Sequence, residues 1–315
     1  MKKYLSLLAI LALTLNSFSQ NYNRVDSITK TLGSLDSFNV ATIADTIARK
    51  FSSKEDKARA LFYWIANNIQ HDLKAVKSND NRKSDPVSVI QSRKATSAGY
   101  ANLIQEMYSM ANIRCLTVDG YTRTTTEDIN NPADEFNHTW NVVQLGQSPE
   151  EWYYVDAFKA AGFADARLTT FTPSFEPGYY FTARYLFNLD HFPDNMAWQL
   201  GPGQKTKKDF YSLPVIGRYA YTLGLTNMTP SIGFNKTKIT RPATYTISYS
   251  NNIPIEKVEL VTGDERRPDK PIPMNFTPNG QSFSFTYTFK KDDEYPVRMM
   301  VNDKVLLGYM YEVSE

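Results

Sequence analysis

Three side chains in the sequence are of the types that perform acyl transfer, and they occur in an order that folding could bring together. Ser97 lies in the stretch RKATSAGYANLI at the predicted start of a helix, His138 opens a strand-like run, and Asp156 ends the next such run. A hydroxyl nucleophile, an imidazole base and a carboxylate that orients the imidazole form a Ser-His-Asp site. Free N–H groups at a helix start would add positive potential beside the hydroxyl. The pattern makes these three residues candidates for catalysis, while a serine at a helix start is also a common N-cap.

The pairing of two predicted strands decides whether this site can form. His138 lies in HTWNVVQL and Asp156 in WYYVDAF, on either side of a turn near residues 146–150. In an antiparallel pair, the two side chains share a face only when residues of equal parity lie opposite each other. An odd register would place them on opposite faces of the sheet.

Other bases and metal ligands are few. The chain has three histidines, and we expect structural roles for His71, at the end of a helix, and for His191, among aromatic residues. Cys115 is the single cysteine and lies in an apolar run, so we expect a buried, inert thiol and no intramolecular disulfide. No ligands occur at the spacing of a usual metal site, so we expect no metal and no cofactor.

The composition is that of a globular protein with about two domains. Of 315 residues, 42% are hydrophobic and 22% are charged, and 35 basic residues nearly balance 33 acidic ones. The formal net charge is +2, without a long basic run, which argues against nucleic-acid binding.

The first residues resemble a secretory signal peptide, which we place at residues 1–19. Lys2 and Lys3 precede an apolar stretch at residues 5–15, and the small residues Ser17 and Ser19 on either side of Phe18 suit cleavage. The apolar stretch is too short to span a bilayer, and no later segment is long enough. We therefore expect a secreted or periplasmic protein that does not span the membrane.

Helices are predicted first and antiparallel strands afterwards, which indicates an α+β domain over residues 20–165. A helix is expected after a capping box of Ser52 and Glu55, and a short helix is expected to begin at Pro86. A helix over about residues 97–111 should end at Asn112.

The rest of the chain divides into two parts. Residues 166–225 are rich in aromatic residues and are expected to pack on the first domain as an extension of it. Residues 226–315 alternate like the strands of an Ig-like β-sandwich, with Asn302 and Asp303 at a predicted hairpin turn. One predicted core face is formed by Ala243, Tyr245, Ile247 and Tyr249.

Three motifs in order resemble the transglutaminase-like superfamily, which has a papain-like cysteine protease fold. The matching residues fall in three groups: Arg93, Lys94, Gly99, Tyr100 and Ala101; Asn137, His138, Trp140 and Asn141; and Trp152, Tyr153, Val155 and Asp156. The later segments YFTARYLFNLDHFPDNMAWQL and DFYSLPVIGRYAYTLGL are similar to the kyphoscoliosis-peptidase branch, in which His191, Pro193, Trp198 and Leu200 would be packing residues. The resemblance implies a transglutaminase-like core, a cleft lined by Gly99, Tyr100, Asn137, Trp140 and Trp152, and a nucleophilic cysteine at the position of Ser97.

The replacement of that cysteine leaves the activity open. A thiol ionises readily beside an imidazole, whereas a hydroxyl must lose its proton as it attacks. One hypothesis is a catalytically impaired protein that binds a peptide, a protein or a cell-wall-type amide in the old cleft. A second is an active peptidase, amidase or acyltransferase that uses Ser97, His138 and Asp156. A third is a structural or adhesion module that acts through the sandwich.

Overall fold

A computed structural model of the chain describes residues 22–146, 148 and 151–315. The predicted signal peptide lies outside these residues. Within them, no helix is both long enough and apolar enough to cross a membrane.

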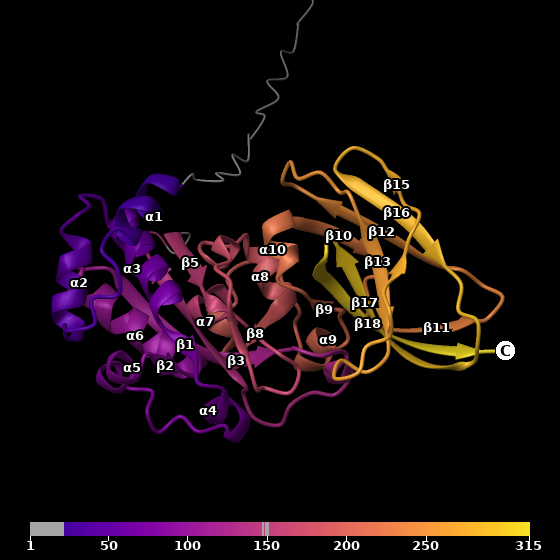
Figure 1. Cartoon of the computed structure of the whole chain (residues 1–315), viewed down its shortest axis with the longest axis horizontal. Coiled ribbons are helices and arrows are strands. Elements are labelled where there is room, and N and C mark those ends of the chain that lie inside the picture. Colours follow the sequence, from indigo (N-terminus) through magenta and orange to yellow (C-terminus); the bar gives the residue numbers. More distant parts are fainter. Residues whose placement is uncertain (1–21, 147, 149–150) are drawn as a thin grey trace, which may run out of the picture.

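The first half of the chain contains most of the long helices (Figure 1). Helix α3 begins after Ser53, whose side chain accepts a hydrogen bond from the backbone N–H of Asp56. The predicted cap at Ser52 is therefore wrong by one residue, and the carboxylate of Glu55 instead accepts a hydrogen bond from the Tyr22 hydroxyl. The helices are α1 (Asn23–Lys30), α2 (Val40–Ala48), α3 (Lys54–Asn68), α4 (Leu73–Ser78), α5 (Pro86–Ser92), α6 (Ser97–Met110), α7 (Ala157–Ala161), α8 (Arg184–Asp190), α9 (Lys207–Tyr211) and α10 (Tyr219–Leu223).

An antiparallel sheet in the order β5-β4-β3-β8 supports these helices, and α6 packs on β3 and β4. Asn141 in β4 pairs with Val155 in β5, which is the even register that the site requires. The strands of this sheet are β3 (Arg114–Thr122), β4 (His138–Gln144), β5 (Trp152–Val155) and β8 (His191–Pro193), and two short pairs lie beside it, β1 (Gln70–His71) with β2 (Lys94–Ala95) and β6 (Gly162–Ala164) with β7 (Phe171–Pro173).

Gly120 allows the sheet to close around the predicted site. It lies opposite His138 on β4 and opposite Pro193 on β8. A Cβ atom at this position would come within 2.5 Å of the Trp140 ring and 2.4 Å of the Phe192 carbonyl oxygen. Only glycine therefore lets the Trp140 ring and β8 approach β3 so closely.

The aromatic-rich extension joins both halves of the molecule. Its strand β8 completes the first sheet, while β9 (Val215–Ile216) pairs with β18 of the C-terminal part. Helix α10 also packs on β18. This segment is thus integrated into the structure and is not a free linker.

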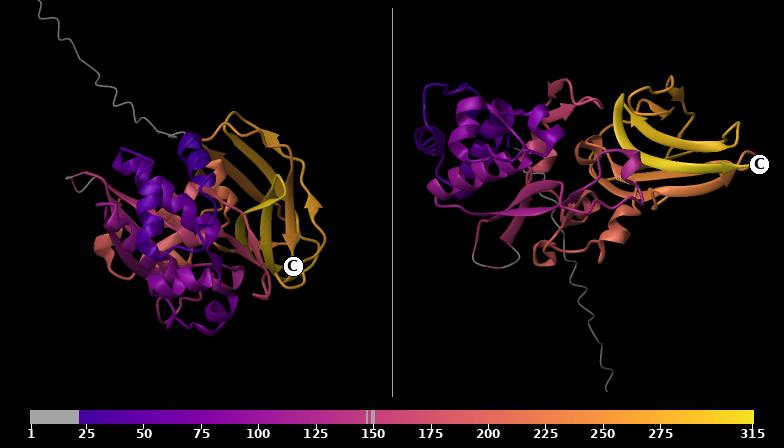
Figure 2. Two further views of the ribbon diagram at one scale, coloured as in Figure 1. Left: turned by 60° about the vertical axis from the view of Figure 1, so that its left-hand side comes forward. Right: turned by 90° about the horizontal axis from the view of Figure 1, so that it is seen from below.

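The C-terminal part consists of two facing sheets, in the orders β10-β12-β16-β15 and β11-β18-β17-β13-β14 (Figures 1 and 2). The predicted core face on β12 is buried, and the Tyr245 ring contacts the rings of Tyr309 and Tyr311 on the opposite sheet. Asn302 and Asp303 have φ values of 49° and 65°, as expected for the predicted hairpin turn. The predicted sandwich is confirmed, and its strands are β10 (Leu225–Thr229), β11 (Phe234–Lys238), β12 (Ala243–Tyr249), β13 (Val258–Thr262), β14 (Ile272–Pro273), β15 (Thr277–Pro278), β16 (Ser282–Tyr287), β17 (Asp293–Val301) and β18 (Lys304–Ser314).

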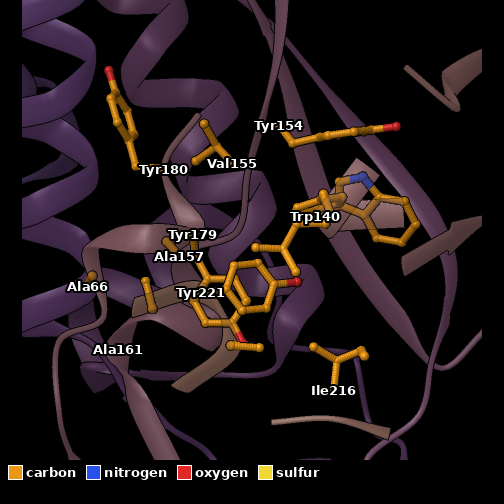
Figure 3. Close-up of a cluster of buried hydrophobic side chains, with 14 of the residues drawn as sticks. Ala66, Trp140, Tyr154, Val155, Ala157, Ala161, Tyr179, Tyr180, Ile216 and Tyr221 are labelled. Atoms are coloured by element: carbon orange, nitrogen blue, oxygen red, sulfur yellow. The ribbon is translucent and has the colours of Figure 1, made fainter. Parts of the chain in front are cut away.

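A continuous apolar core extends from the first helices into the sandwich. Figure 3 shows a part of this core, in which Trp140 and Tyr154 of the sheet, Tyr221 of α10 and Ile216 of β9 are all buried. The fold is therefore an α+β core followed by a sandwich that shares its packing.

Candidate functional site

Ser97 is the first residue of α6 and is half-buried. The preceding residue, Thr96, does not cap the helix with its side chain, because its hydroxyl donates to Asn81 Oδ1 at 2.6 Å. The first N–H groups of α6 therefore lack a side-chain cap beside the Ser97 hydroxyl. Ser97 Oγ accepts a hydrogen bond from the backbone N–H of Thr139 at 3.3 Å, one residue along β4 from His138.

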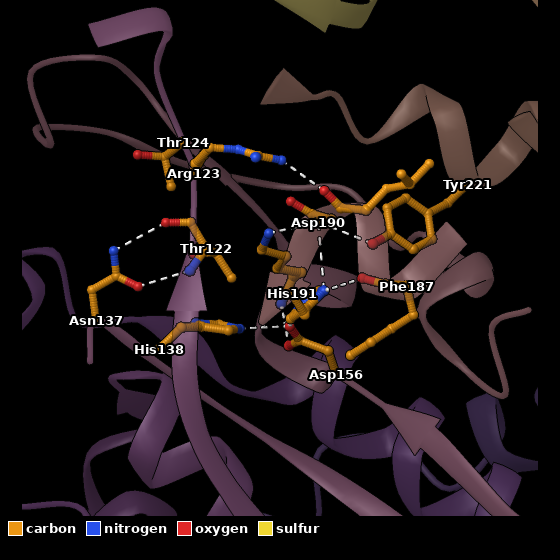
Figure 4. Close-up of polar contacts among 12 residues, drawn as sticks. Thr122, Arg123, Thr124, Asn137, His138, Asp156, Phe187, Asp190, His191 and Tyr221 are labelled. Atoms are coloured by element: carbon orange, nitrogen blue, oxygen red, sulfur yellow. Dashed lines mark hydrogen bonds and ion pairs between the residues drawn. The ribbon is translucent and has the colours of Figure 1, made fainter. Parts of the chain in front are cut away.

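His138 and Asp156 form the short polar contact at the centre of the site (Figure 4). Nε2 of His138 lies 2.6 Å from Oδ2 of Asp156, and both side chains are buried. The other carboxylate oxygen, Oδ1, accepts the backbone N–H of Lys159 at 2.9 Å and so caps α7. The carboxylate is thus fixed by the helix start on one side and by the imidazole on the other.

A second imidazole, from His191, also contacts this carboxylate. Its Nε2 lies 3.1 Å from the same Oδ2 of Asp156, and the side chain has no exposed surface. The ring is stacked on Phe187, with ring centroids 3.7 Å apart. Sequence reasoning predicted a hydrogen-bonded packing residue at His191 but not its partner, since the 35 positions that separate it from Asp156 give no local signal.

A buried ion pair lies behind His191. Lys159 Nζ donates to Asp190 Oδ2 at 2.7 Å, and the Tyr221 hydroxyl donates to the same oxygen at 3.0 Å. Nδ1 of His191 lies 3.8 Å from this oxygen and 3.3 Å from the Phe187 carbonyl oxygen. Polar groups therefore continue from the site into the core as far as Lys159, whose side chain is 14% exposed.

Burial and charge shift the protonation of these groups in opposite directions. Burial alone would raise the pKa of Asp156, but the imidazoles of His138 and His191 hold it well below its usual range. Burial lowers the pKa of His191 to about 4, with a further lowering by the Lys159 ammonium and an opposing effect of Asp156. The carboxylate of Asp156 is therefore ionised at neutral pH, and His191 is neutral.

Four of the five predicted cleft-lining residues are buried. Gly99, Tyr100, Trp140 and Trp152 are all buried, and the three aromatic side chains belong to the apolar core. Only Asn137 is exposed, and its side chain pairs with the backbone of Thr122 through both its oxygen and its nitrogen. The four buried residues pack the elements of the site together from inside, and their assignment to a cleft stays a prediction.

The contacts of these residues show how they do so. The Tyr100 hydroxyl donates to the carbonyl oxygen of Ile69, which ties α6 to the end of α3. A Cβ atom on Gly99 would lie 2.8 Å from Cβ of Ala95, so glycine permits close packing at the start of α6. Trp140 lies beside His138 on β4, with their rings stacked at a centroid distance of 6.2 Å.

Two surface hollows are found beside the other helices. They lie along α6 and the neighbouring helices α2 and α5, and neither is lined by Ser97, His138 or Asp156. Neither hollow therefore bears on the chemistry of the predicted site.

The remaining nucleophile and base candidates are unsuited to catalysis. Cys115 is buried and burial raises the pKa of its thiol well above the usual range, in agreement with the predicted inert thiol. His71 was expected to act as a cation at a helix end, but burial lowers its pKa to about 4, so the ring is neutral. Its Nε2 contacts the Phe158 carbonyl oxygen at 2.8 Å and its ring is stacked on Phe158.

Folding also assembles a group of metal-ligand types that the sequence spacing did not predict. One ligand atom from each of His138, Asp156 and His191 lies within 4.8 Å of the others. Two imidazoles and a carboxylate are suitable donors for zinc or iron. Here, both imidazoles hydrogen bond directly to the carboxylate.

The arrangement contains the parts of an acyl-transfer site with one connection missing. Because Nε2 of His138 is bonded to Asp156, Nδ1 is the nitrogen left to exchange a proton with a nucleophile. Among the described residues, however, Ser97 Oγ and His138 are not hydrogen bonded to each other, and the serine hydroxyl instead meets the Thr139 amide. The imidazole–carboxylate pair is complete, but the hydroxyl is not joined to it.

Comparison with known proteins finds similarity in the region of the chain that contains the candidate site. Residues 41–157, which include all three candidate catalytic residues, match the model of the transglutaminase-like superfamily. The chain is 30% identical to human kyphoscoliosis peptidase over 193 residues and 29% identical to the mouse protein over 206 residues, which is 61% and 65% of this chain. It is also 23% identical over 266 residues, or 80% of its length, to the Lim and transglutaminase domain protein ltd-1 of Caenorhabditis elegans. These matches span 29%, 30% and 32% of the human, mouse and nematode relatives.

Proposed function

We propose a function for this chain, which contains a transglutaminase-like domain of the kyphoscoliosis-peptidase type. The domain engages a peptide or another amide-containing ligand at the Ser97 end of α6 and is catalytically impaired. The protein is exported, as the predicted signal peptide at residues 1–19 suggests, and N-terminal sequencing of the protein from its native host tests this. An N-terminus that retains those residues would argue against export.

One observation carries the impairment. Ser97 Oγ is 3.3 Å from the Thr139 amide nitrogen and is not hydrogen bonded to His138. A serine attacks only when a base removes its proton as the new bond forms, so a hydroxyl that is not hydrogen bonded to the base is a poor nucleophile. A thiol at the same position could be stored as a thiolate beside an imidazolium and would need no such transfer during attack.

Ligand engagement is supported by the start of α6. Its uncapped N–H groups provide positive potential at a half-buried position, where a carbonyl oxygen of an amide could accept a hydrogen bond. Binding of a fluorescent glutamine-containing peptide, measured by anisotropy and by competition with the unlabelled peptide, tests this part. Competable binding that Ser97→Trp abolishes supports the proposal, whereas binding unaffected by that variant contradicts it.

The substitution Ser97→Cys tests the impairment directly. We expect iodoacetamide to alkylate the thiol introduced by this substitution at least about tenfold faster than Cys115, which is an internal reference for a buried thiol. The rate should fall in the double variant Ser97→Cys/His138→Ala, since the imidazole stabilises the thiolate. Equal alkylation with and without His138 would show that the old site no longer activates a nucleophile of any kind.

A second candidate function is favoured by the 2.6 Å contact between His138 and Asp156. This pair could support an active serine peptidase, amidase or acyltransferase if the Ser97 hydroxyl rotates toward His138. Intact mass after treatment with a fluorophosphonate distinguishes the two functions. We expect no labelling of the folded wild-type protein, while stoichiometric labelling that is lost in Ser97→Ala and His138→Ala would establish the active enzyme.

A further inference from the structure

The buried ring of His191 has no role in the three-residue site described above, yet it contacts that site directly. Its Nε2 lies 3.1 Å from Oδ2 of Asp156, the oxygen that His138 also contacts. The ring centroids of His191 and His138 are 5.5 Å apart, so both imidazoles converge on one carboxylate oxygen (Figure 4). This contact requires more than close packing, because either the imidazole nitrogen or the carboxylate oxygen must carry a hydrogen for the two atoms to bond.

The tautomer of His191 follows from its surroundings. A neutral imidazole carries one N–H, whereas both ring nitrogens of His191 face acceptors, Asp156 on one side and the Phe187 carbonyl oxygen on the other. The contact with Asp156 is the shorter one, 3.1 Å against 3.3 Å, and its acceptor is negatively charged. Hydrogen bonds to a charged acceptor are about twice as strong as neutral ones, so the hydrogen belongs on Nε2.

We propose that His191 is a positioning residue that donates its Nε2–H to Asp156 and thereby holds the carboxylate in the orientation that fixes the tautomer of His138. The inference rests on the proposed function in so far as His138 serves a nucleophile at position 97. Three hydrogen bonds then restrain Asp156, from His138 and His191 to Oδ2 and from the backbone of Lys159 to Oδ1.

The elements around His191 suit such a role. The ring is held by stacking on Phe187 at 3.7 Å and by an edge contact with Trp140 at 5.1 Å, so it has little freedom to turn. A donor on a rigid ring restrains its acceptor, as the groups behind a catalytic imidazole or a metal ligand do. His191 reaches this place because β8 pairs with the end of β3 opposite β4.

The three donor atoms could instead share a cation, and this is the alternative that the test must separate. A metal bound by His138, Asp156 and His191 would use the lone pair of each Nε2, so neither nitrogen could then carry a hydrogen. The hydrogen bonds and the metal site therefore predict different tautomers for the same two rings.

Nitrogen-15 NMR of the full chain with labelled histidine measures these tautomers directly. The chain has only three histidines, and single substitutions assign each signal. We expect the Nε2–H tautomer for both His138 and His191, and no change on addition of Zn²⁺. An Nδ1–H tautomer of His191, or shifts of both residues with Zn²⁺, would overturn the proposal.

Two variants separate positioning from packing. His191→Phe keeps an aromatic ring but removes the N–H, whereas His191→Gln loses the ring but places an amide N–H near the position of Nε2. We expect a mixture of His138 tautomers in His191→Phe and the wild-type Nε2–H tautomer in His191→Gln. An unchanged His138 tautomer in a folded His191→Phe variant would refute a positioning role.

The same pair of variants in the Ser97→Cys background gives a functional reading. Alkylation of the introduced thiol by iodoacetamide should be at least about tenfold slower with His191→Phe and within about threefold of the parent with His191→Gln. Equal slowing by both variants would indicate packing alone and contradict the proposal. If Ser97→Cys is itself unreactive, the proposed function fails, while the tautomers of the wild-type protein still decide the role of His191.

Discussion

The two halves of this protein bury different kinds of side chain. In the part that precedes the sandwich, residues 22–225 with the extension included and called the first half here, buried groups include ionisable side chains in contact with one another, among them Asp156, His138, His191 and Asp190. In the sandwich, the buried polar side chains of the described residues, tyrosines aside, are Glu259 and Thr262. Burial of charge is costly unless it is paired, so a fold retains it mainly where geometry requires it. The difference indicates that the chemistry of the molecule lies in the first half. The sandwich core is stabilised mainly by the packing of apolar and aromatic side chains.

The largest effect should follow from removal of the central carboxylate. Asp156→Ala leaves two buried imidazoles without their acceptor and uncaps α7, so we expect the free energy of unfolding to fall by about 4 kcal/mol at pH 7. Urea unfolding followed by circular dichroism measures this loss.

The pH dependence of that loss identifies its cause. The folded state holds the pKa of Asp156 well below its usual range, so the stabilisation is present above the pKa of the unfolded chain, about 4, and is lost as the pH falls below it. The difference between wild type and Asp156→Ala should therefore shrink in acid. A difference that is constant down to about pH 3 would mean that the charge of Asp156 does not stabilise the fold.

Truncation of a buried apolar side chain in the sandwich should lower the free energy of unfolding by less, and the loss should not depend on pH. Ile247 is fully buried on β12, and Ile247→Ala should lower the free energy of unfolding by about 3 kcal/mol through the cavity it leaves. The matched variant Ile247→Val should lower it by about 1 kcal/mol. A strong pH dependence of either loss would contradict the contrast between the two halves.

The last effect, which is confined to acid pH, concerns His71 in the first half. Burial lowers the pKa of this residue from 6.5 to about 4, so between these values the unfolded chain binds a proton that the folded chain does not. The free energy of unfolding should fall as the pH decreases through this range, by up to about 1.4 kcal/mol per pH unit for one proton. His71→Gln should flatten this slope relative to wild type, and an identical slope in the variant would assign the acid sensitivity to other groups.

Local patterns allowed most of the elements to be predicted. Pro86 begins α5, Ser97 begins α6, and Asn112, with a φ of 56°, follows the end of α6. Each of these signals depends on a few neighbouring residues and on backbone geometry, which is why they are visible in the sequence. The error at Ser52 and Ser53 has the same origin, since adjacent serines offer two equivalent caps and only the path of the entering chain selects one.

The site could be predicted only in part. Ser97, His138 and Asp156 remain the candidate catalytic residues, and the structure brings two of them into direct contact. The burial of four predicted cleft-lining residues was not foreseen, because a motif shows which residues occur together and not which side of a helix or sheet meets solvent.

Local sequence was enough to set the order of the elements, the alternation of the sandwich strands and the presence of a serine at position 97, where the resemblance described above implies a cysteine. Those properties follow from local backbone preferences and from residue identity. The tertiary structure decided that β8 brings His191 onto Asp156, and that the Ser97 hydroxyl meets the Thr139 amide instead of His138. These contacts join residues 35 and 42 positions apart, and they depend on strand order and helix packing, which no short stretch of sequence encodes.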